Sequence, residues 1–168
     1  GRLDEVAQQA VKKGAEVKAV VADATRPEAG NAFLRTALAE YGAIDALVNC
    51  QGESQILYFE ALSDAEWDRV VTTNLSSVVY TCRFAFDQMK RQGGGHIINI
   101  GSQASLTGSS QAAAYLAAKA GVEGLGKALA HEGRAFGIRV TTVCPGPMNT
   151  PMRWNATPDM PRETLLDP

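Results

Sequence analysis

The stretch from residue 96 to residue 144 decides the fold. It begins with the apolar run HIINIG at residues 96–101 and continues through a loop rich in Ser and Gly. A helical pattern then extends from about Gln111 to Arg134, Gly137 ends it, and a second apolar run, IRVTTVC, fills residues 138–144. A strand, a long helix and another strand form a βαβ unit, which predicts parallel strand pairing.

The same alternation continues toward the N-terminus. Residues 44–49 form an apolar run of strand length, and a helical pattern follows from Ser63 to Gly93. Further upstream, residues 16–23 are predicted to form a short strand that ends at Asp23, between two helical segments. Thr25 with Glu28, and Ser63 with Glu66, have the spacing of capping boxes at two helix starts. We therefore expect an α/β fold with a doubly wound, Rossmann-like parallel sheet.

Composition narrows the class of protein. The 168 residues carry a formal net charge of -2, with 45% hydrophobic and 20% charged residues, which is typical of one globular domain. The absence of a basic block argues against a nucleic-acid partner, and no apolar run approaches the length of a membrane span. Cys50, Cys82 and Cys144 have no metal-ligand spacing, so we predict no metal site and a location in the reducing cytoplasm.

Ligands of open α/β sheets bind beyond the carboxyl ends of the strands, so the residues there are the first candidates. The residues at the carboxyl ends of the predicted strands are all polar, small or conformationally special: Asp23, Asn49, Ser102 and Pro145-Gly146. These residues predict a binding site along one edge of the sheet.

Tyr115 and Lys119 add reactive groups to that edge. They lie four residues apart in the predicted helix, so their side chains share a face. An ammonium about 4 Å from a phenol, at an effective dielectric constant near 20, would stabilise the phenolate by about 4 kcal/mol. Such a phenol can exchange a proton with an alcohol or a carbonyl, and a hydroxyl such as that of Ser102 could hold the substrate oxygen. No side chain accepts a hydride, which implies a nicotinamide cofactor. The alternative is an exposed helical Tyr–Lys pair without a role.

The order of these motifs resembles the short-chain dehydrogenase/reductase family. The similarity covers nearly the whole chain and rests on five segments. They are LVNCQG (47–52) for the family's LVNNAG, WDRVVTTNL (67–75) for its W…N(L/V) helix, IINIGS (97–102) for IvNisS, YLAAK (115–119) for YxxxK, and CPGPMNT (144–150) for xPGxxxT.

The resemblance implies an NAD(P)-dependent oxidoreductase that interconverts an alcohol and a ketone or aldehyde. Its implied catalytic residues are Asn74, Ser102, Tyr115 and Lys119, with Tyr115 as the acid/base. Its implied cofactor-binding residues are Asp23, Asn49, Gly52, Tyr115, Lys119, Pro145, Gly146 and Thr150. Residues 1–168 would form a single, partial dinucleotide-binding oxidoreductase domain in which residues 147–168 are the substrate-loop region. The family also implies a small-molecule alcohol or carbonyl substrate and a homodimer or homotetramer.

The sequence departs from the family pattern at several places. Cys50 and Gln51 replace the usual Asn and Ala, and Gly101 replaces a frequent Ser. The glycine-rich phosphate loop, TGxxxGxG, does not occur in the 168 residues. By its match to the family we expect an upstream strand–helix–strand of about 30 or more residues, and a last strand and helix after Pro168. The sheet would then be incomplete at both ends.

These departures leave alternatives open. Without its neighbours, the strand at residues 16–23 would be unpaired, so either the sequence is a piece of a longer protein or this strand is displaced. We expect the 168 residues alone to bind cofactor poorly. A truncated or degenerate family member that acts as a noncatalytic binding module is the competing hypothesis. Arg2, placed near a 2′-phosphate site, favours NADP over NAD, whereas the substrate and the direction of the reaction stay open.

Overall fold

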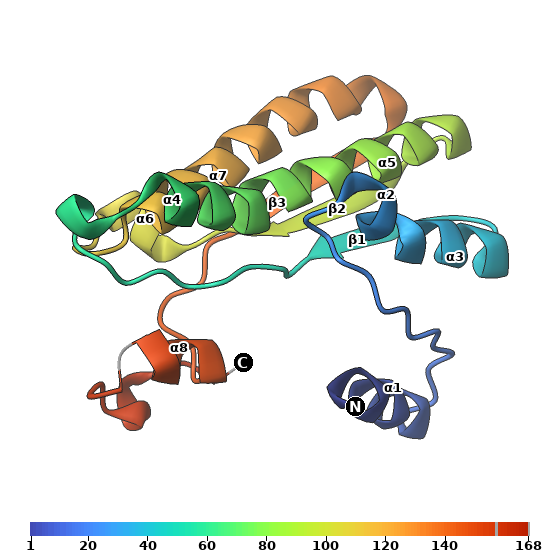
Figure 1. The fold of residues 1–168 in the computed structure, drawn as a ribbon. Helices are drawn as coiled ribbons and strands as arrows, with labels where there is room; N and C mark the ends of the chain where they lie inside the picture. Colours follow the sequence, from blue (N-terminus) through green and yellow to red (C-terminus); the bar gives the residue numbers. More distant parts are fainter. Residues whose placement is uncertain (157, 168) are drawn as a thin grey trace.

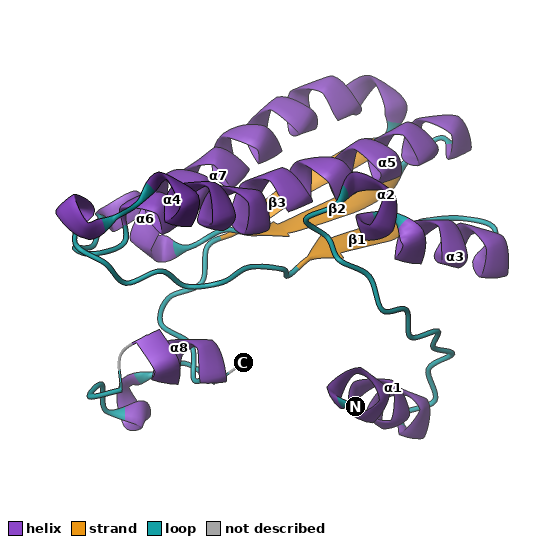
Figure 2. Cartoon of the chain, viewed as in Figure 1, coloured by secondary structure: helices purple, strands orange, loops and turns teal. Residues whose placement is uncertain are grey.

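A parallel sheet organises the protein, as the βαβ pattern predicts. The computed structural model describes residues 1–156 and 158–167. Its sheet contains β1 (Ala46–Asn49), β2 (Gly95–Ile100) and β3 (Ile138–Val143) in the order β1-β2-β3, all parallel. Figure 1 shows the long helices packed over one face of this sheet, and Figure 2 separates strands from helices and loops. The predicted α/β, Rossmann-like fold class is confirmed.

The hydrophobic core lies between the sheet and two helices, α5 (Ser77–Gln92) and α7 (Ala113–Gly133). Met89 of α5, Ile97 of β2 and Val122 of α7 are fully buried in it. Along β1 the burial alternates, because Leu47 points into the core whereas Val48 is half exposed. One face of the sheet therefore supplies most of the buried apolar surface.

The region predicted as one helix from Ser63 to Gly93 contains a change of helical geometry. It consists of α4 (Asp64–Val71), a π-helical turn η2 (Thr72–Ser76) and α5. The Ser63 hydroxyl accepts a hydrogen bond from the Glu66 N–H at 3.2 Å, which confirms the predicted helix start. Gly93 ends α5 with a left-handed φ of 88°. The π-helical turn adds a bulge in the middle of the helical stretch.

Three glycines inside α7 face different surroundings. A Cβ on Gly126 would lie 2.2 Å from Thr142 Oγ1 of β3, and one on Gly121 would lie 2.7 Å from a Leu75 methyl of η2. Gly124 has open space around that position. Close packing on the sheet and on η2 therefore offsets the helix-weakening effect of Gly126 and Gly121, whereas Gly124 has no such compensation.

The N-terminal segment differs from the prediction. After α1 (Arg2–Lys12), residues 15–23 run without a strand to α2 (Pro27–Gly30) and α3 (Ala32–Tyr41). The predicted strand at 16–23 is wrong, because this segment pairs with none of the three described strands, and a strand needs a ladder partner. Asp23, rather than Thr25 as a cap, makes the local turn by accepting hydrogen bonds from the Thr25 N–H at 2.9 Å and hydroxyl at 2.6 Å.

The C-terminal segment folds back on itself. It contains α8 (Pro151–Ala156) and the short turn η4 (Arg162–Thr164). The Leu166 N–H donates to the Pro147 carbonyl at 2.9 Å, and the Leu166 carbonyl accepts from the Asn149 N–H at 2.7 Å. These bonds close the segment into a compact loop that lies apart from the sheet in Figure 1. Within residues 1–156 and 158–167, none of the helices has the length and apolar character needed to span a membrane.

Candidate active site

Lys119 lies at the centre of the candidate site. Its side chain is 5% exposed, and Nζ donates a hydrogen bond to the Ile100 carbonyl at the end of β2, at 2.8 Å. Nζ also lies 5.9 Å from the ring centroid of Tyr115, one helical turn earlier on α7. Burial lowers the pKa of Lys119, and nearby Cys50 and Cys144 partly offset that effect. The sequence prediction that Tyr115 and Lys119 share one helix face is confirmed.

Asn74 reaches the same place from the π-helical turn. It is fully buried, its Nδ2 donates to the Val70 carbonyl at 3.0 Å, and its Oδ1 accepts from the Glu53 N–H at 3.1 Å. A Cβ on Gly52 would lie 2.7 Å from Asn74 Oδ1 and 3.4 Å from Lys119 Nζ. The main chain at Gly52 therefore packs directly against both functional groups, and only a glycine leaves them in place.

Ser102 follows β2 and begins the short helix α6 (Gln103–Thr107). Its hydroxyl accepts from the Ala104 N–H at 3.2 Å, as a helix cap does. The Gln103 N–H donates to the Pro145 carbonyl at 2.9 Å, which joins the segment after β2 to the segment after β3. Because Lys119 Nζ binds the Ile100 carbonyl, the α7 face and the ends of β2 and β3 meet at one edge of the sheet.

Asn49 uses its side chain inside the core. Nδ2 donates to Asn99 Oδ1 at 2.8 Å, and Oδ1 accepts from the Thr81 hydroxyl at 2.8 Å. Asn49 Nδ2 also contacts the Cys82 thiol at 3.3 Å, and burial raises the pKa of that thiol to about 12. The Asn49 amide therefore couples β1, β2 and α5. The isolated Asn99 within HIINI is the sequence signal for this network.

Two predicted cofactor residues have other partners. Asp23 is exposed between α1 and α2, where the hydrogen bonds from Thr25 lower its pKa. The Thr150 hydroxyl accepts from the Arg153 N–H at 3.4 Å, and its carbonyl accepts from the Trp154 N–H at 3.0 Å, so Thr150 caps α8. The contacts of the described residues do not bring either one to Lys119.

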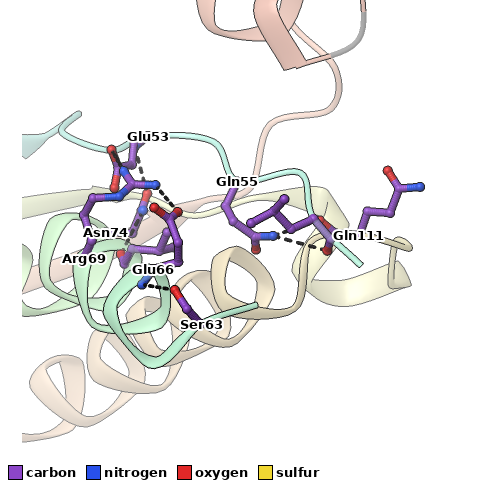
Figure 3. A network of polar contacts seen from close by, with 9 residues as sticks. Glu53, Gln55, Ser63, Glu66, Arg69, Asn74 and Gln111 are labelled. Carbon is purple, nitrogen blue, oxygen red and sulfur yellow. Dashed lines mark hydrogen bonds and ion pairs between the residues drawn. The ribbon is translucent and has the colours of Figure 1, made fainter. Parts of the chain in front are cut away.

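Sequence reasoning missed the polar residues that hold the loop after β1 (Figure 3). Gln55 is 4% exposed, and its Nε2 donates to the Gln111 carbonyl at 3.2 Å. Gln111 itself has a φ of 62°, which is unusual for a residue other than glycine. On the other side of the loop, Glu53 pairs with Arg69 of α4. These contacts join residues that are distant in the sequence, so no local sequence pattern predicts them.

Comparisons with known proteins identify the family of the chain. Residues 1–161 match the profile of the short chain dehydrogenase family. The chain is 38% identical over 141 residues to a D-beta-hydroxybutyrate dehydrogenase of Rhizobium meliloti, covering 84% of this chain and 55% of that protein. It is 36% identical over 149 residues to an acetoacetyl-CoA reductase of Allochromatium vinosum, covering 89% of this chain and 61% of that protein.

A solved structure gives the same result. A short chain dehydrogenase from Mycobacterium smegmatis superposes with a TM-score of 0.83 at 35% sequence identity, and the match covers 86% of this chain and 61% of that one. The chain therefore spans little more than half to about three-fifths of the length of these relatives.

Proposed function

Because this chain belongs to the short-chain dehydrogenase family, we propose that the protein is an NAD(P)-dependent oxidoreductase that interconverts an alcohol and a ketone or aldehyde. The observation that carries the proposal is the meeting of Tyr115, Lys119 and Asn74 at one edge of the sheet. Lys119 Nζ lies 5.9 Å from the centroid of the Tyr115 ring. A Cβ on Gly52 would lie 3.4 Å from Lys119 Nζ and 2.7 Å from Asn74 Oδ1, so both groups border the same main-chain position. A buried amine beside a phenol at the end of parallel strands is suited to proton transfer at a substrate oxygen.

The residues around Lys119 fit one half of a nicotinamide dinucleotide. The backbone cradle at Gly52 has no room for a side chain, and the buried Lys119 ammonium has donor capacity beyond its bond to Ile100. Lys119 and Tyr115 would hold the ribose of the nicotinamide end, with Gly52, Pro145 and Gly146 alongside. When bound, the cofactor supplies or accepts the hydride that no side chain can carry. The preference for NADP over NAD rests on Arg2 alone, which the family resemblance places near a 2′-phosphate site.

The residues of the chain then have defined roles. In the reducing direction, the Tyr115 hydroxyl donates a proton to the substrate oxygen, and in the oxidising direction the phenolate accepts it. The Lys119 ammonium stabilises that phenolate electrostatically. The Ser102 hydroxyl positions the substrate oxygen, and Asn74 connects Lys119 to solvent through a water. For Asp23 and Thr150, we propose contacts with the cofactor only on the basis of the family resemblance.

We propose short 3-oxoacyl or 3-hydroxyacyl compounds as the substrate class. The similar proteins include the hydroxybutyrate dehydrogenase, the acetoacetyl-CoA reductase and a 3-oxoacyl-(acyl-carrier-protein) reductase of Chlamydia muridarum, 34% identical over 154 residues. Residues 147–168 would form the substrate loop of the dinucleotide-binding domain, although residues 157 and 168 lie outside the described residues. A homodimer or homotetramer in the cytoplasm completes the proposal.

The test is oxidation of NADPH or NADH by the purified intact protein, rather than by residues 1–168 alone, with acetoacetate, acetoacetyl-CoA and a 3-oxoacyl thioester. We expect turnover with at least one substrate and a faster rate with NADPH. Turnover with none of them, in either direction and with either cofactor, would contradict the proposed function. A matched Ser102→Ala variant should lose most of the activity while it retains cofactor binding, because Ser102 contacts the substrate rather than the cofactor.

A further inference from the structure

An ion-pair network fastens the loop after β1 to α4 (Figure 3). One end of the Arg69 guanidinium pairs with the Glu53 carboxylate, and the other donates to Glu66 Oε2 at 2.7 Å. Glu66 lies one turn earlier on the same helix, whereas Glu53 belongs to the loop. The planar guanidinium can hold two carboxylates at once, so Arg69 joins a helix to a loop.

Glu53 is also held through its main chain. Its N–H donates to Asn74 Oδ1 at 3.1 Å, while its carboxylate is held by Arg69. The preceding residue, Gly52, packs against Asn74 Oδ1 and Lys119 Nζ without room for a Cβ. A shift of Glu53 would therefore change the position of the Gly52 main chain and the surroundings of both functional groups.

We propose that Glu53 and Arg69 are positioning residues whose ion pair fixes the loop after β1, so that Asn74 and Lys119 keep their reactive arrangement. This inference rests on the function proposed above. Neither side chain touches the reacting atoms, and each acts through the Glu53 main chain and Asn74. The reaction should therefore be slower without the pair, although the fold and the catalytic side chains are intact.

The solvent exposure of these side chains distinguishes a positioning role of the ion pair from a role in the stability of the fold. The side chains of Arg69, Glu53 and Glu66 are 45%, 30% and 40% exposed, respectively. Solvent screens ion pairs at such positions, so they contribute little to the stability of the whole fold. The Arg69–Glu66 contact is local to α4, which makes Glu66 the matched control for Glu53: both replacements remove one carboxylate from the same guanidinium.

The experiment compares Glu53→Gln, Arg69→Met, Arg69→Lys and Glu66→Gln in the intact protein. We expect kcat to fall by about 10-fold to 100-fold in Glu53→Gln and Arg69→Met, because a misplacement of reacting groups by about 1 Å can slow a reaction by about 100-fold. Arg69→Lys should be intermediate, and Glu66→Gln should retain the wild-type rate. Denaturation midpoints should coincide for all variants, and hydrogen exchange at the Glu53 amide should accelerate only where kcat falls.

Two results would overturn the inference: kcat values of Glu53→Gln and Glu66→Gln that coincide, or a Glu53 amide whose exchange rate does not respond to loss of the pair. If Arg69→Met fails to fold, the isosteric Glu53→Gln decides between these outcomes. A wild-type protein without hydride transfer would instead contradict the proposed function. In that case the exchange rate of the Glu53 amide still decides whether the pair anchors the loop.

Discussion

The site edge of the sheet and the N-terminal segment, residues 1–25, both contain polar and apolar residues, but the two regions differ in burial and in contacts with other elements. At the site edge, Asn74 and Lys119 are buried, and each has a hydrogen-bond partner from another element. In the N-terminal segment, α1 has no buried residue and Val21 is 91% exposed. An amphipathic or apolar pattern becomes part of the packed core only where another element packs against it, and α1 is a helix that packs against none of the described core elements.

The difference has a functional consequence. Lys119 donates to the Ile100 carbonyl of β2, and both Lys119 and Asn74 pack against Gly52, so a small displacement of one group affects the others. Asp23 forms its own turn with Thr25 and shares no contact with that cluster. Of the predicted site residues, those on α7 and η2 form one cluster because the sheet and helices hold them together.

The largest effect should follow from removing the charge at the centre of this cluster. Lys119→Met removes both the ammonium beside Tyr115 and the donor to Ile100. We expect kcat/KM to fall by about 100-fold or more, with a higher KM for the cofactor.

The pH dependence of the wild-type rate tests the same ammonium. Burial lowers the Lys119 pKa, so the ammonium loses its proton at a lower pH than an exposed lysine does, and the rate should decline on the alkaline side before pH 10.5. Steady-state kinetics against pH measures both effects, and a Lys119→Met profile equal to wild type would contradict them.

A pair of truncations compares the two regions directly. Ile97→Ala in the buried strand β2 should lower the free energy of unfolding by about 2–5 kcal/mol, because it leaves a cavity in the core. Val21→Ala should change it by less than about 0.5 kcal/mol, because that side chain is exposed. Urea denaturation measures both values. A loss at Val21 comparable to that at Ile97 would show that something outside the described residues covers this segment.

The parallel sheet, its βαβ connections and the Tyr115–Lys119 face were predictable from the sequence, because apolar runs and helical spacing directly encode them. The strand at residues 16–23 was not, since strand formation depends on a partner rather than on the segment itself. Asn49 was predicted only as a cofactor residue, although its amide joins three elements in the core. The left-handed Gln111 and the Glu53–Arg69 pair depend on tertiary packing, which no local pattern reveals.

The glycines of α7 allow a smaller test within one helix. Gly126→Ala should destabilise the protein by about 1–3 kcal/mol, because the new Cβ would overlap Thr142 Oγ1. Gly124→Ala meets open space and should stabilise the helix by up to about 1 kcal/mol. Thermal denaturation of the two variants should give shifts of opposite sign. Equal shifts would mean that α7 does not pack on β3 at Gly126 as closely as described.

A further effect, confined to alkaline pH, concerns the buried thiol of Cys82. Burial raises its pKa from 9.0 to about 12, so the thiol stays protonated to a higher pH in the folded state than in the unfolded state. The resulting stability is fully present below pH 9.0 and is lost as the pH rises toward about 12. The slope attributable to this thiol should approach about 1.4 kcal/mol per pH unit. Denaturation at several alkaline pH values should show a shallower decline for Cys82→Ala than for wild type, and parallel curves would contradict this account.

Substitution of the phenol tests the central claim most directly. In the intact protein, Tyr115→Phe removes one hydroxyl and keeps the ring that packs near Lys119. Turnover should fall by at least about 100-fold, because the proton donor is lost, while the cofactor dissociation constant measured by titration stays nearly unchanged. A Tyr115→Phe variant that reduces substrate at the wild-type rate would remove Tyr115 from the acid/base role.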